Sequence, residues 1–579
     1  MIKRTLSKAQ WNSVIAINFE DIQKNADDVR GSLWNKHNFH KNLKCYLENT
    51  TLHGLKYLAE DKITVTERVF FGLSFVLVVT LSSFFISNIY GKWSASPIIV
   101  TLSAKQTTDT DIPFPAITIC NLNQARKSKV QSIGKQISFR FVHIQILIRL
   151  SLPFYLRSSE NFSLLLSLCN QVSNDLDVTY VGTWKNFKAI LTKVAQPCNE
   201  MLLYCSFGSR IENCSSIFRT ILTDDGLCCT FNALDPKYLF MNYSEDNLLR
   251  SYEDDEYTAI DWTPDKGYGK NLPVKFSPRT SGGIGKNMGL TVILNASSDE
   301  YYCSKTNSAG FKFLVHNPAN LPKISNYGVL LAAGREAFIP IYPIYEDAGP
   351  RIQSHKQAVR RCLFSEEGNL TYYRSYSREN CRYECEARLL QKICSCVLYY
   401  LPRSDPAIRI CGPNDNVCTS RLLMKIESSN DSVACDDCLP GCFELSYRTG
   451  LSTSPMIAGT FGNSNGGYPE GIFNSTTGIR DVSIVHFFYT TNTFRSTTKS
   501  EIIGLTEFLS NTGGILSLFM GFSIFSVIEI FYYATLRPYC ATRTNKKNRI
   551  ASQQDIKARY RIYVIFQFIF QLFTTYTTR

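Results

Sequence analysis

The sequence lacks the motifs that mark common enzyme classes. It contains no HExxH metalloprotease pair, no GxSxG nucleophile elbow and no Walker phosphate loop, and its seven histidines are scattered. Charged residues make up only 19% of the chain. The formal net charge of +13 is dispersed and no nucleic-acid-binding motif accompanies it, so nucleic acid is not an expected partner.

Two acidic clusters, Asp224-Asp225 and Asp254-Asp255-Glu256, come nearest to a catalytic set. Paired carboxylates can act as general acid and base, but charge on solvated loops is the simpler interpretation. Such clusters could also bind protons or cations and so influence the rest of the molecule. No spacing in the chain supports catalysis, so we expect no enzymatic activity and no cofactor.

Long charge-free runs are also few. The first 60 residues are polar and hold no apolar core near Met1, which argues against a cleaved signal peptide. Residues 69–91 form one charge-free run of 23 residues, and 21 uncharged residues lie between Glu507 and Glu529. Each run is long enough for a helix to cross the hydrocarbon core of a bilayer. The sequence therefore predicts two membrane spans.

Two other apolar stretches fit a span less well. Residues 137–156 contain Arg140 and Arg149, which would place charge in the middle of a bilayer. We interpret them as an insertion or a helix outside the membrane. Residues 562–576 are short and contain glutamine, which suits a segment at the membrane interface, with a third crossing as the alternative.

Cysteines are scarce outside one block of the chain. Of 20 cysteines, 18 lie between Cys120 and Cys442, with only Cys45 and Cys540 outside. A dense, even set is typical of a disulfide framework in an oxidising compartment. Seven Asn-x-Ser/Thr sequons between the two spans predict N-glycosylation at Asn161, Asn213, Asn242, Asn295, Asn369, Asn430 and Asn474.

These features agree on one topology. A basic flank follows the second span, from Arg537 to Arg549, and prefers the cytosol. Both termini are therefore expected in the cytosol of a multi-pass plasma-membrane protein. The expected divisions are 1–68 cytosolic, 69–91 first transmembrane helix, 92–507 extracellular, 508–536 second transmembrane helix and 537–579 cytosolic.

The second span has an unusual face. Ser510, Gly513, Ser517 and Gly521 fall at spacings of three, four and four, so a helix would present them on one side. Small residues in such a stripe either allow close helix packing or line a pore, and identical helices meeting around an axis would satisfy both. Glu529 could attract cations at an inner mouth or pair with a basic residue.

Several motifs in order resemble the epithelial sodium channel/degenerin family. His53-Gly54 precedes the first span, and FPAITICN at 114–121 follows it as a β-rich run suited to a strand descending to the membrane. A Gly-x-Ser sequence lies in the second span. Further likenesses are the segment 205–232 ending in GLCCTFN, DWTPDKGY at 261–268, GFKFLVHNP at 310–318 and CDDCLPGC at 435–442.

The likeness covers about residues 45–540, and the DWTPDKGY region is most similar to the insect pickpocket branch. It implies a membrane protein with two transmembrane α-helices flanking a large disulfide-rich α+β extracellular domain of palm, thumb and finger architecture. Residues 310–318 resemble the family's palm strand and alternate as a half-buried strand would.

The cysteines leave a metal-binding alternative. Their spacing would also suit zinc ligands in two groups, Cys381, Cys385, Cys394 and Cys396, and Cys435, Cys438 and Cys442. A glycosylated extracellular domain favours disulfides instead, so no metal is expected. Sequence alone does not set the pairing. The resemblance implies Cys120–Cys228, Cys205–Cys214, Cys362–Cys442, Cys381–Cys438, Cys385–Cys435, Cys394–Cys418 and Cys396–Cys411. Four cysteines remain for two further bridges: Cys169, Cys198, Cys229 and Cys303.

The resemblance also implies roles in a pore. Gly521-Phe522-Ser523 matches the selectivity sequence, where glycine frees a carbonyl and serine offers a hydroxyl to a small cation. Ser510 lies three residues before the glycine pair Gly513-Gly514. It matches the position of a small, gating-sensitive residue in the family. The implied pore and gating set is Ser510, Gly513, Gly514, Ser517, Glu529, His53 and Gly54, with His53 and Gly54 in a cytoplasmic re-entrant segment.

We therefore expect a subunit of a ligand- or mechanically gated, sodium-permeable, amiloride-sensitive channel. Its expected partners are sodium ions, the lipid bilayer and other degenerin-type subunits in a homo- or heterotrimer. A non-conducting receptor or accessory subunit that assembles with conducting relatives is the alternative. An extracellular enzyme would require a catalytic set that the sequence does not contain.

Overall fold

The computed structural model describes most of the chain, in two compact units. One unit comprises residues 98–501, and the other combines the residues that flank it on both sides. The described residues are 36–95, 98–132, 165, 168–169, 184–241, 257–403, 405, 407–428, 435–457 and 480–537. The apolar stretches at 137–156 and 562–576 lie outside these ranges.

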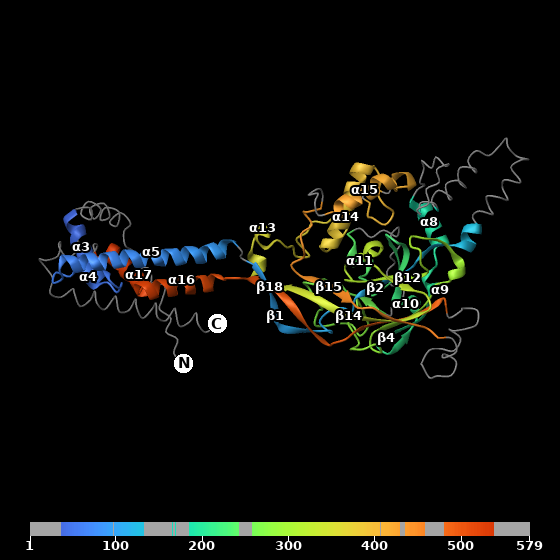
Figure 1. The fold of residues 1–579 in the computed structure, drawn as a ribbon, viewed down its shortest axis with the longest axis horizontal. Coiled ribbons are helices and arrows are strands. Elements are labelled where there is room, and N and C mark those ends of the chain that lie inside the picture. Colours follow the sequence, from blue (N-terminus) through green and yellow to red (C-terminus); the bar gives the residue numbers. More distant parts are fainter. Residues whose placement is uncertain are drawn as a thin grey trace, which may run out of the picture. The chain divides into compact units, whose positions relative to one another are not determined.

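A nine-stranded sheet forms the larger half of unit 98–501 (Figure 1). Its path runs β1-β18-β14-β17-β10-β4-β5, with β15 and β16 also paired to β14. The strands are β1 (Ile98–Thr108), β18 (Thr493–Glu501), β14 (Arg335–Ala348), β17 (Val482–Tyr489), β10 (Leu290–Asn295), β4 (Leu202–Phe207), β5 (Arg210–Glu212), β15 (Glu444–Thr449) and β16 (Ser452–Pro455).

The first and last strands of this unit are neighbours. β1 and β18 pair antiparallel, with Ile98 opposite Glu501, so the chain enters and leaves the unit at one place. β14 runs parallel to both β17 and β18 and connects them. The strand that follows the first long helix in sequence is β1, and residues 114–121 come after it in the chain.

Residues 114–121 instead supply the centre of a second sheet of five strands. Its order is β13 (Val329–Ala332), β12 (Gly310–His316), β2 (Ala116–Asn121), β7 (Gly226–Phe231) and β6 (Phe218–Thr223). All six residues of β2 are buried. The sequence predicted that buried and exposed residues would alternate along β12. They do not alternate regularly, because five of its seven residues are buried, and Lys312 is one of them.

One apolar cluster joins the two sheets. Ile117 of β2 and Phe313 of β12 pack in the same cluster as Val292 of β10 and Ile339 of β14. Each apolar side chain of this size contributes about 1.5–3 kcal/mol when it is fully buried. This shared core makes the two sheets one folded unit. Two short pairs complete the strands: β3 (Asn123–Arg126) with β11 (Tyr301–Ser304), and β8 (Thr258–Ala259) with β9 (Phe276–Ser277).

Two helices, α14 (Arg378–Cys394) and α15 (Asn416–Glu427), form a separate layer of this unit. Ser377 caps α14 by accepting the backbone N–H of Asn380. The disulfide Cys394–Cys418 ties the end of α14 to α15. The shorter helices are α8 (Trp184–Val194), α9 (Cys198–Met201), α10 (Cys214–Ile217), α11 (Pro236–Leu239), α12 (Ile324–Tyr327), α13 (Gln357–Arg360), η1 (Ser298–Glu300), η2 (Ile352–Ser354) and η3 (Pro413–Asp415).

Nine disulfides cross-link unit 98–501. Seven join the pairs that the resemblance implied: Cys120–Cys228, Cys205–Cys214, Cys362–Cys442, Cys381–Cys438, Cys385–Cys435, Cys394–Cys418 and Cys396–Cys411. The four remaining cysteines, whose pairing the sequence left open, form Cys169–Cys303 and Cys198–Cys229. Cys45 is free, and Cys540 lies outside the described residues.

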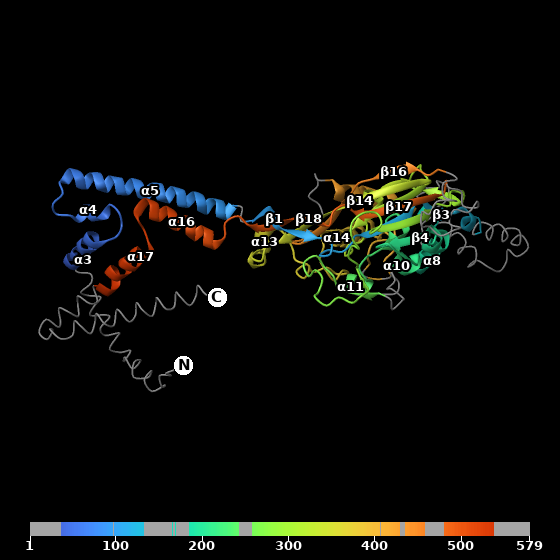
Figure 2. The ribbon, with the colours of Figure 1, turned by 90° about the horizontal axis from the view of Figure 1, so that it is seen from below.

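The second unit is helical. It contains α3 (Lys36–Asn49), α4 (Leu55–Ala59), α5 (Val65–Ala95), α16 (Leu505–Met520), α17 (Ile524–Phe531) and the π-helical turn η4 (Tyr532–Leu536). Within α5, residues Val65–Ser94 are long and apolar enough to cross a membrane. α16 runs along α5, where Phe519 stacks on Phe85 and Phe508 stacks on Trp93 (Figure 2).

The second predicted span is not one continuous helix. α16 and the segment Ile524–Leu536 together are apolar enough for a crossing, but they meet at an angle of 73°. A single helix over 508–536 is therefore not what the chain forms. The helix starts at Leu505, breaks after Met520 and resumes at Ile524.

Candidate functional site

Gly521, Phe522 and Ser523 form the break between α16 and α17. Gly521 has φ +66°, a left-handed conformation that glycine adopts without a Cβ penalty, and its N–H donates to the carbonyl of Ser517 at 2.8 Å. Ser523 then caps α17, because its Oγ accepts the N–H of Ser526 while Ser526 Oγ accepts the N–H of Ser523. The residues of the predicted selectivity sequence thus end one helix and begin the next.

His53 reaches this break from the other end of the chain. Its N–H donates to the carbonyl of Met520 at 3.0 Å. Its ring packs so closely on Gly521 that a Cβ at this position would lie 2.6 Å from His53 Cε1. Gly54 follows with φ +86° and starts α4. The structure therefore brings together the His-Gly pair and the Gly-x-Ser sequence, which the resemblance treated as separate parts of a pore.

Thr51 binds the second helix of the broken pair. Its backbone N–H and its hydroxyl lie 3.0 Å and 3.1 Å from Glu529 Oε2, and its hydroxyl also lies 3.0 Å from Ser526 Oγ. Sequence reasoning singled out neither Thr51 nor Ser526. The spacing of Ser526 and Glu529 does place them on one helical face, but nothing local identifies Thr51 as their partner.

Glu529 has a hydroxyl and a backbone N–H as partners. Among residues 36–95 and 502–537 of this unit, no lysine or arginine forms an ion pair with it. The carboxylate accepts hydrogen bonds from Thr51 instead. The interpretation that Glu529 pairs with a basic residue is wrong for the described part of the chain.

The small residues of α16 face away from α5. Phe508 and Phe519 contact α5, whereas Ser510, Gly513 and Ser517 lie about 120–180° around the helix from them at 3.6 residues per turn. All three are exposed. A Cβ on Gly513 or on the neighbouring Gly514 would meet no atom within 4 Å. Among the described residues of one chain, nothing packs against Gly513 or Gly514 on this face.

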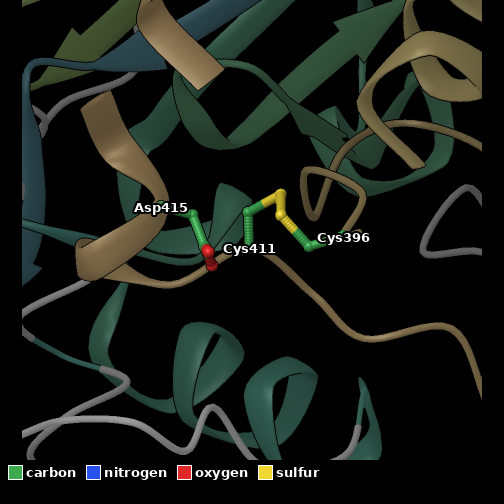
Figure 3. Close-up of side chains that lie close together, drawn as sticks. All are labelled: Cys396, Cys411 and Asp415. Atoms are coloured by element: carbon green, nitrogen blue, oxygen red, sulfur yellow. A yellow bond between two sulfur atoms is a disulfide. The ribbon is translucent and has the colours of Figure 1, made fainter. Parts of the chain in front are cut away.

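The zinc alternative has no support in the described residues. The ten cysteines between Cys362 and Cys442 are all in disulfides, which removes their thiolates as ligands. One group, Cys396, Cys411 and Asp415, is close enough to suggest a metal site (Figure 3). Its two sulfurs are bonded to each other, and Asp415 forms an ion pair with Arg409 at 2.7 Å.

The acidic pair Asp224-Asp225 is buried, so its interpretation as solvated loop charge is wrong. The carboxylate of Asp224 accepts the N–H groups of Ile324 and Ser325, and Asp225 forms an ion pair with Lys312. Burial raises the pKa of Asp224 to about 6. Both acids are occupied in holding segments of the fold together. The cluster Asp254-Asp255-Glu256 lies outside the described residues.

Three of the seven sequons fall in the described part of the chain. Asn213 and Asn369 are exposed, and Asn295 is partly buried. Asn213 also caps α10 by accepting the N–H of Ser215. The other four asparagines, Asn161, Asn242, Asn430 and Asn474, lie outside the described residues. Glycosylation remains a prediction at all seven.

Comparison with known proteins places these features in a family context. The family model described as "Amiloride-sensitive sodium channel" matches residues 46–533. The chain is 59% identical to Pickpocket protein 28 of Drosophila melanogaster over 521 residues, which cover 90% of this chain and 82% of the relative. It is 25% identical to sodium channel protein Nach of Drosophila ananassae, covering 89% of each. It is 23% identical to human acid-sensing ion channel 2, covering 85% of each.

Proposed function

Because the chain belongs to the amiloride-sensitive sodium channel (epithelial sodium channel/degenerin) family, we propose that it is a pore-forming subunit of a sodium-permeable cation channel. One observation carries the proposal: His53 packs on Gly521 at the break between α16 and α17. A helix break in an apolar span leaves backbone carbonyls free of intrahelical partners. Such carbonyls are tolerated at membrane depth only where protein or a water-filled path surrounds them.

The residues at the break suit a small cation. The proposed selectivity residues are Gly521, Phe522 and Ser523, of which Ser523 is exposed within one chain. Carbonyl and hydroxyl oxygens can replace part of the hydration shell of an ion. His53 and Gly54 would narrow the path next to this ring, and Ser510, Gly513, Gly514 and Ser517 would line it further along α16.

Assembly follows from the exposed face of α16. A stripe of small residues that no other described residue of its own chain covers at Gly513 or Gly514 suits the close approach of identical helices. Three copies around an axis would bring three such stripes together. We propose a homo- or heterotrimer of degenerin-type subunits on this basis.

The proposed topology places the disulfide-rich unit outside the cell. Residues 69–91 and 508–536 would cross the plasma membrane, the second of them as a broken helix, with 92–507 outside and 1–68 and 537–579 in the cytosol. Nine disulfides in unit 98–501 suit an oxidising compartment. Opening by a ligand or by force, and block by amiloride, belong to the same proposal.

The direct test is a current recording from cells that express this chain alone. We expect an inward cation current that falls when sodium is replaced by a large organic cation and that amiloride blocks. Ser510→Val should add a constitutive current by holding the exposed face of α16 apart. Ser83→Val, the same exchange at an exposed serine of α5, serves as the control. Absence of constitutive current from Ser510→Val chains at the cell surface would favour a non-conducting accessory subunit.

A further inference from the structure

Thr51, Ser526 and Glu529 form one continuous chain of hydrogen bonds. Ser526 Oγ accepts the N–H of Ser523 at 3.1 Å and lies 3.0 Å from Thr51 Oγ1, which lies 3.1 Å from Glu529 Oε2. An ionised carboxylate can only accept. The hydroxyl of Thr51 therefore donates to Glu529, and that of Ser526 donates to Thr51.

Of the residues in this hydrogen-bonded series, Ser526 is buried in a single subunit, whereas Thr51 is exposed. Ser526 is only 1% exposed. Hydrogen bonds to a charged acceptor are roughly twice as strong as those between neutral groups. Glu529 Oε2 receives two of them from the same residue, one from the backbone and one from the side chain of Thr51.

The contact between Thr51 and Glu529 matters because His53, two residues after Thr51, binds the other helix of the broken pair. Thr51 attaches to α17 through Glu529, and His53, two residues later, attaches to α16 through the carbonyl of Met520. The short segment 51–53 is thus fixed to both sides of the break. A change in the 73° angle between the two helices would strain these two attachments.

We propose that Thr51 is a positioning residue that fixes segment 51–53 across the break and so sets the open–closed equilibrium of the pore. Glu529 then serves as the acceptor that holds Thr51, and its charge does not serve to attract cations. This inference rests on the proposed channel function, because the geometry of the break matters to gating only if ions pass it.

The first experiment separates positioning from ion attraction by single-channel recording of the full-length chain. Thr51→Val keeps the shape of the side chain but removes the hydroxyl. We expect it to change the open probability about tenfold, because it removes a hydrogen bond to a charged acceptor. Unit conductance should change less than twofold, and Thr51→Ser, which keeps the hydroxyl, should restore the wild-type open probability.

Substitutions of Glu529 are compared with Thr51→Val in the same recordings. Glu529→Gln removes the charge but keeps an oxygen acceptor, so we expect a smaller change in open probability than Glu529→Ala produces. In Thr51→Val chains, Glu529→Gln should have little additional effect, because the two residues share one interaction. The proposal is overturned if Thr51→Val leaves gating unchanged, or if Glu529→Gln mainly lowers unit conductance.

The second experiment tests the contact without current. In full-length chains that carry Cys45→Ser and Cys540→Ser, the pair Thr51→Cys and Ser526→Cys should form a disulfide on oxidation in membranes, detected as protection from a maleimide-polyethylene glycol mass tag. Thr51→Cys with Ser510→Cys, on the far part of α16, is the matched control and should remain tagged. Equal tagging of both pairs would contradict the contact. Formation of the cross-link in a chain that carries no current would instead refute the channel function, and the gating role with it.

Discussion

The ammonium group of Lys312 lies 2.8 Å from Asp225 Oδ2, and both side chains are buried. Lys312 is in β12 and Asp225 is in the turn between β6 and β7, so the ion pair joins two strands that are not neighbours in the five-stranded sheet. Lys305 lies 3.5 Å from the other oxygen of Asp225. This pair explains why a lysine is tolerated in the middle of a buried strand.

Removal of one partner should be costly. Asp225→Asn would leave the buried ammonium of Lys312 without a countercharge, and loss of one side of a buried pair typically costs 3–5 kcal/mol. We expect the free energy of unfolding, measured on the full chain in detergent, to fall by about this amount. Adding Lys312→Met to Asp225→Asn should recover much of the loss. If Asp225→Asn lowered the free energy of unfolding no more than a substitution of an exposed residue does, the ion pair would not have this role.

Asp224, the neighbouring residue, should make stability depend on pH. Burial raises its pKa from 3.8 to about 6. Between these values the folded chain holds a proton that the unfolded chain has released, so this group makes the free energy of unfolding decrease as the pH rises from 4 to 6. The shift of roughly two units corresponds to about 3 kcal/mol.

The test compares unfolding at pH 4 and pH 6.5 in wild-type and Asp224→Asn chains. The asparagine variant should lack the contribution of Asp224 to the slope. Asp261→Asn, at a side chain that is 49% exposed, is the control and should keep the wild-type slope. Identical slopes in all three proteins would show that Asp224 does not titrate in this range.

Gly521→Ala should disrupt the helix break. The added Cβ would meet the ring of His53 at 2.6 Å, and φ of +66° is unfavourable for alanine. We expect loss of sodium current at normal surface expression. Gly91→Ala, in α5, where a Cβ meets nothing within 4 Å in the same chain, is the matched helix control for folding and surface delivery.

A second substitution separates the two causes. His53→Ala in the Gly521→Ala background removes the steric clash but not the strain of the positive φ. Partial recovery of current would identify the contact with His53 as the main effect. If Gly521→Ala alone conducted like the wild type, the break would not need glycine.

Two disulfides should differ in their contributions to stability. Cys362–Cys442 closes a separation of 80 residues, and Cys205–Cys214 closes one of 9. With the nested Cys381–Cys438 bridge intact, the first disulfide closes a loop of about 23 residues, so loop-closure entropy predicts about 3.4 kcal/mol for it and about 2.6 kcal/mol for the second. Thermal unfolding of the two double-serine variants should therefore show the larger loss for Cys362→Ser with Cys442→Ser. The reverse order would mean that native contacts, and not chain entropy, dominate.

Some features of the fold could be predicted because their signals are local. Charge-free runs of membrane length identify 69–91 and the segment before Glu529, and the helix α5 extends the first of them to Val65–Ala95. The alternation expected for residues 310–318 was wrong because Lys312 is polar and yet buried. Its partner Asp225 comes from a distant part of the chain, so no local pattern could reveal it.

The candidate site likewise has some features that the sequence predicts and others that it does not. The sequence by itself determined that the second span is long enough to cross a bilayer and holds a stripe of small residues with a Gly-x-Ser sequence, because length, composition and spacing are local properties. Only the tertiary structure decided that the helix does break there, and that Thr51 and His53 bind its two sides. Such contacts join residues from opposite ends of the chain, and their geometry exists only after the helices have packed.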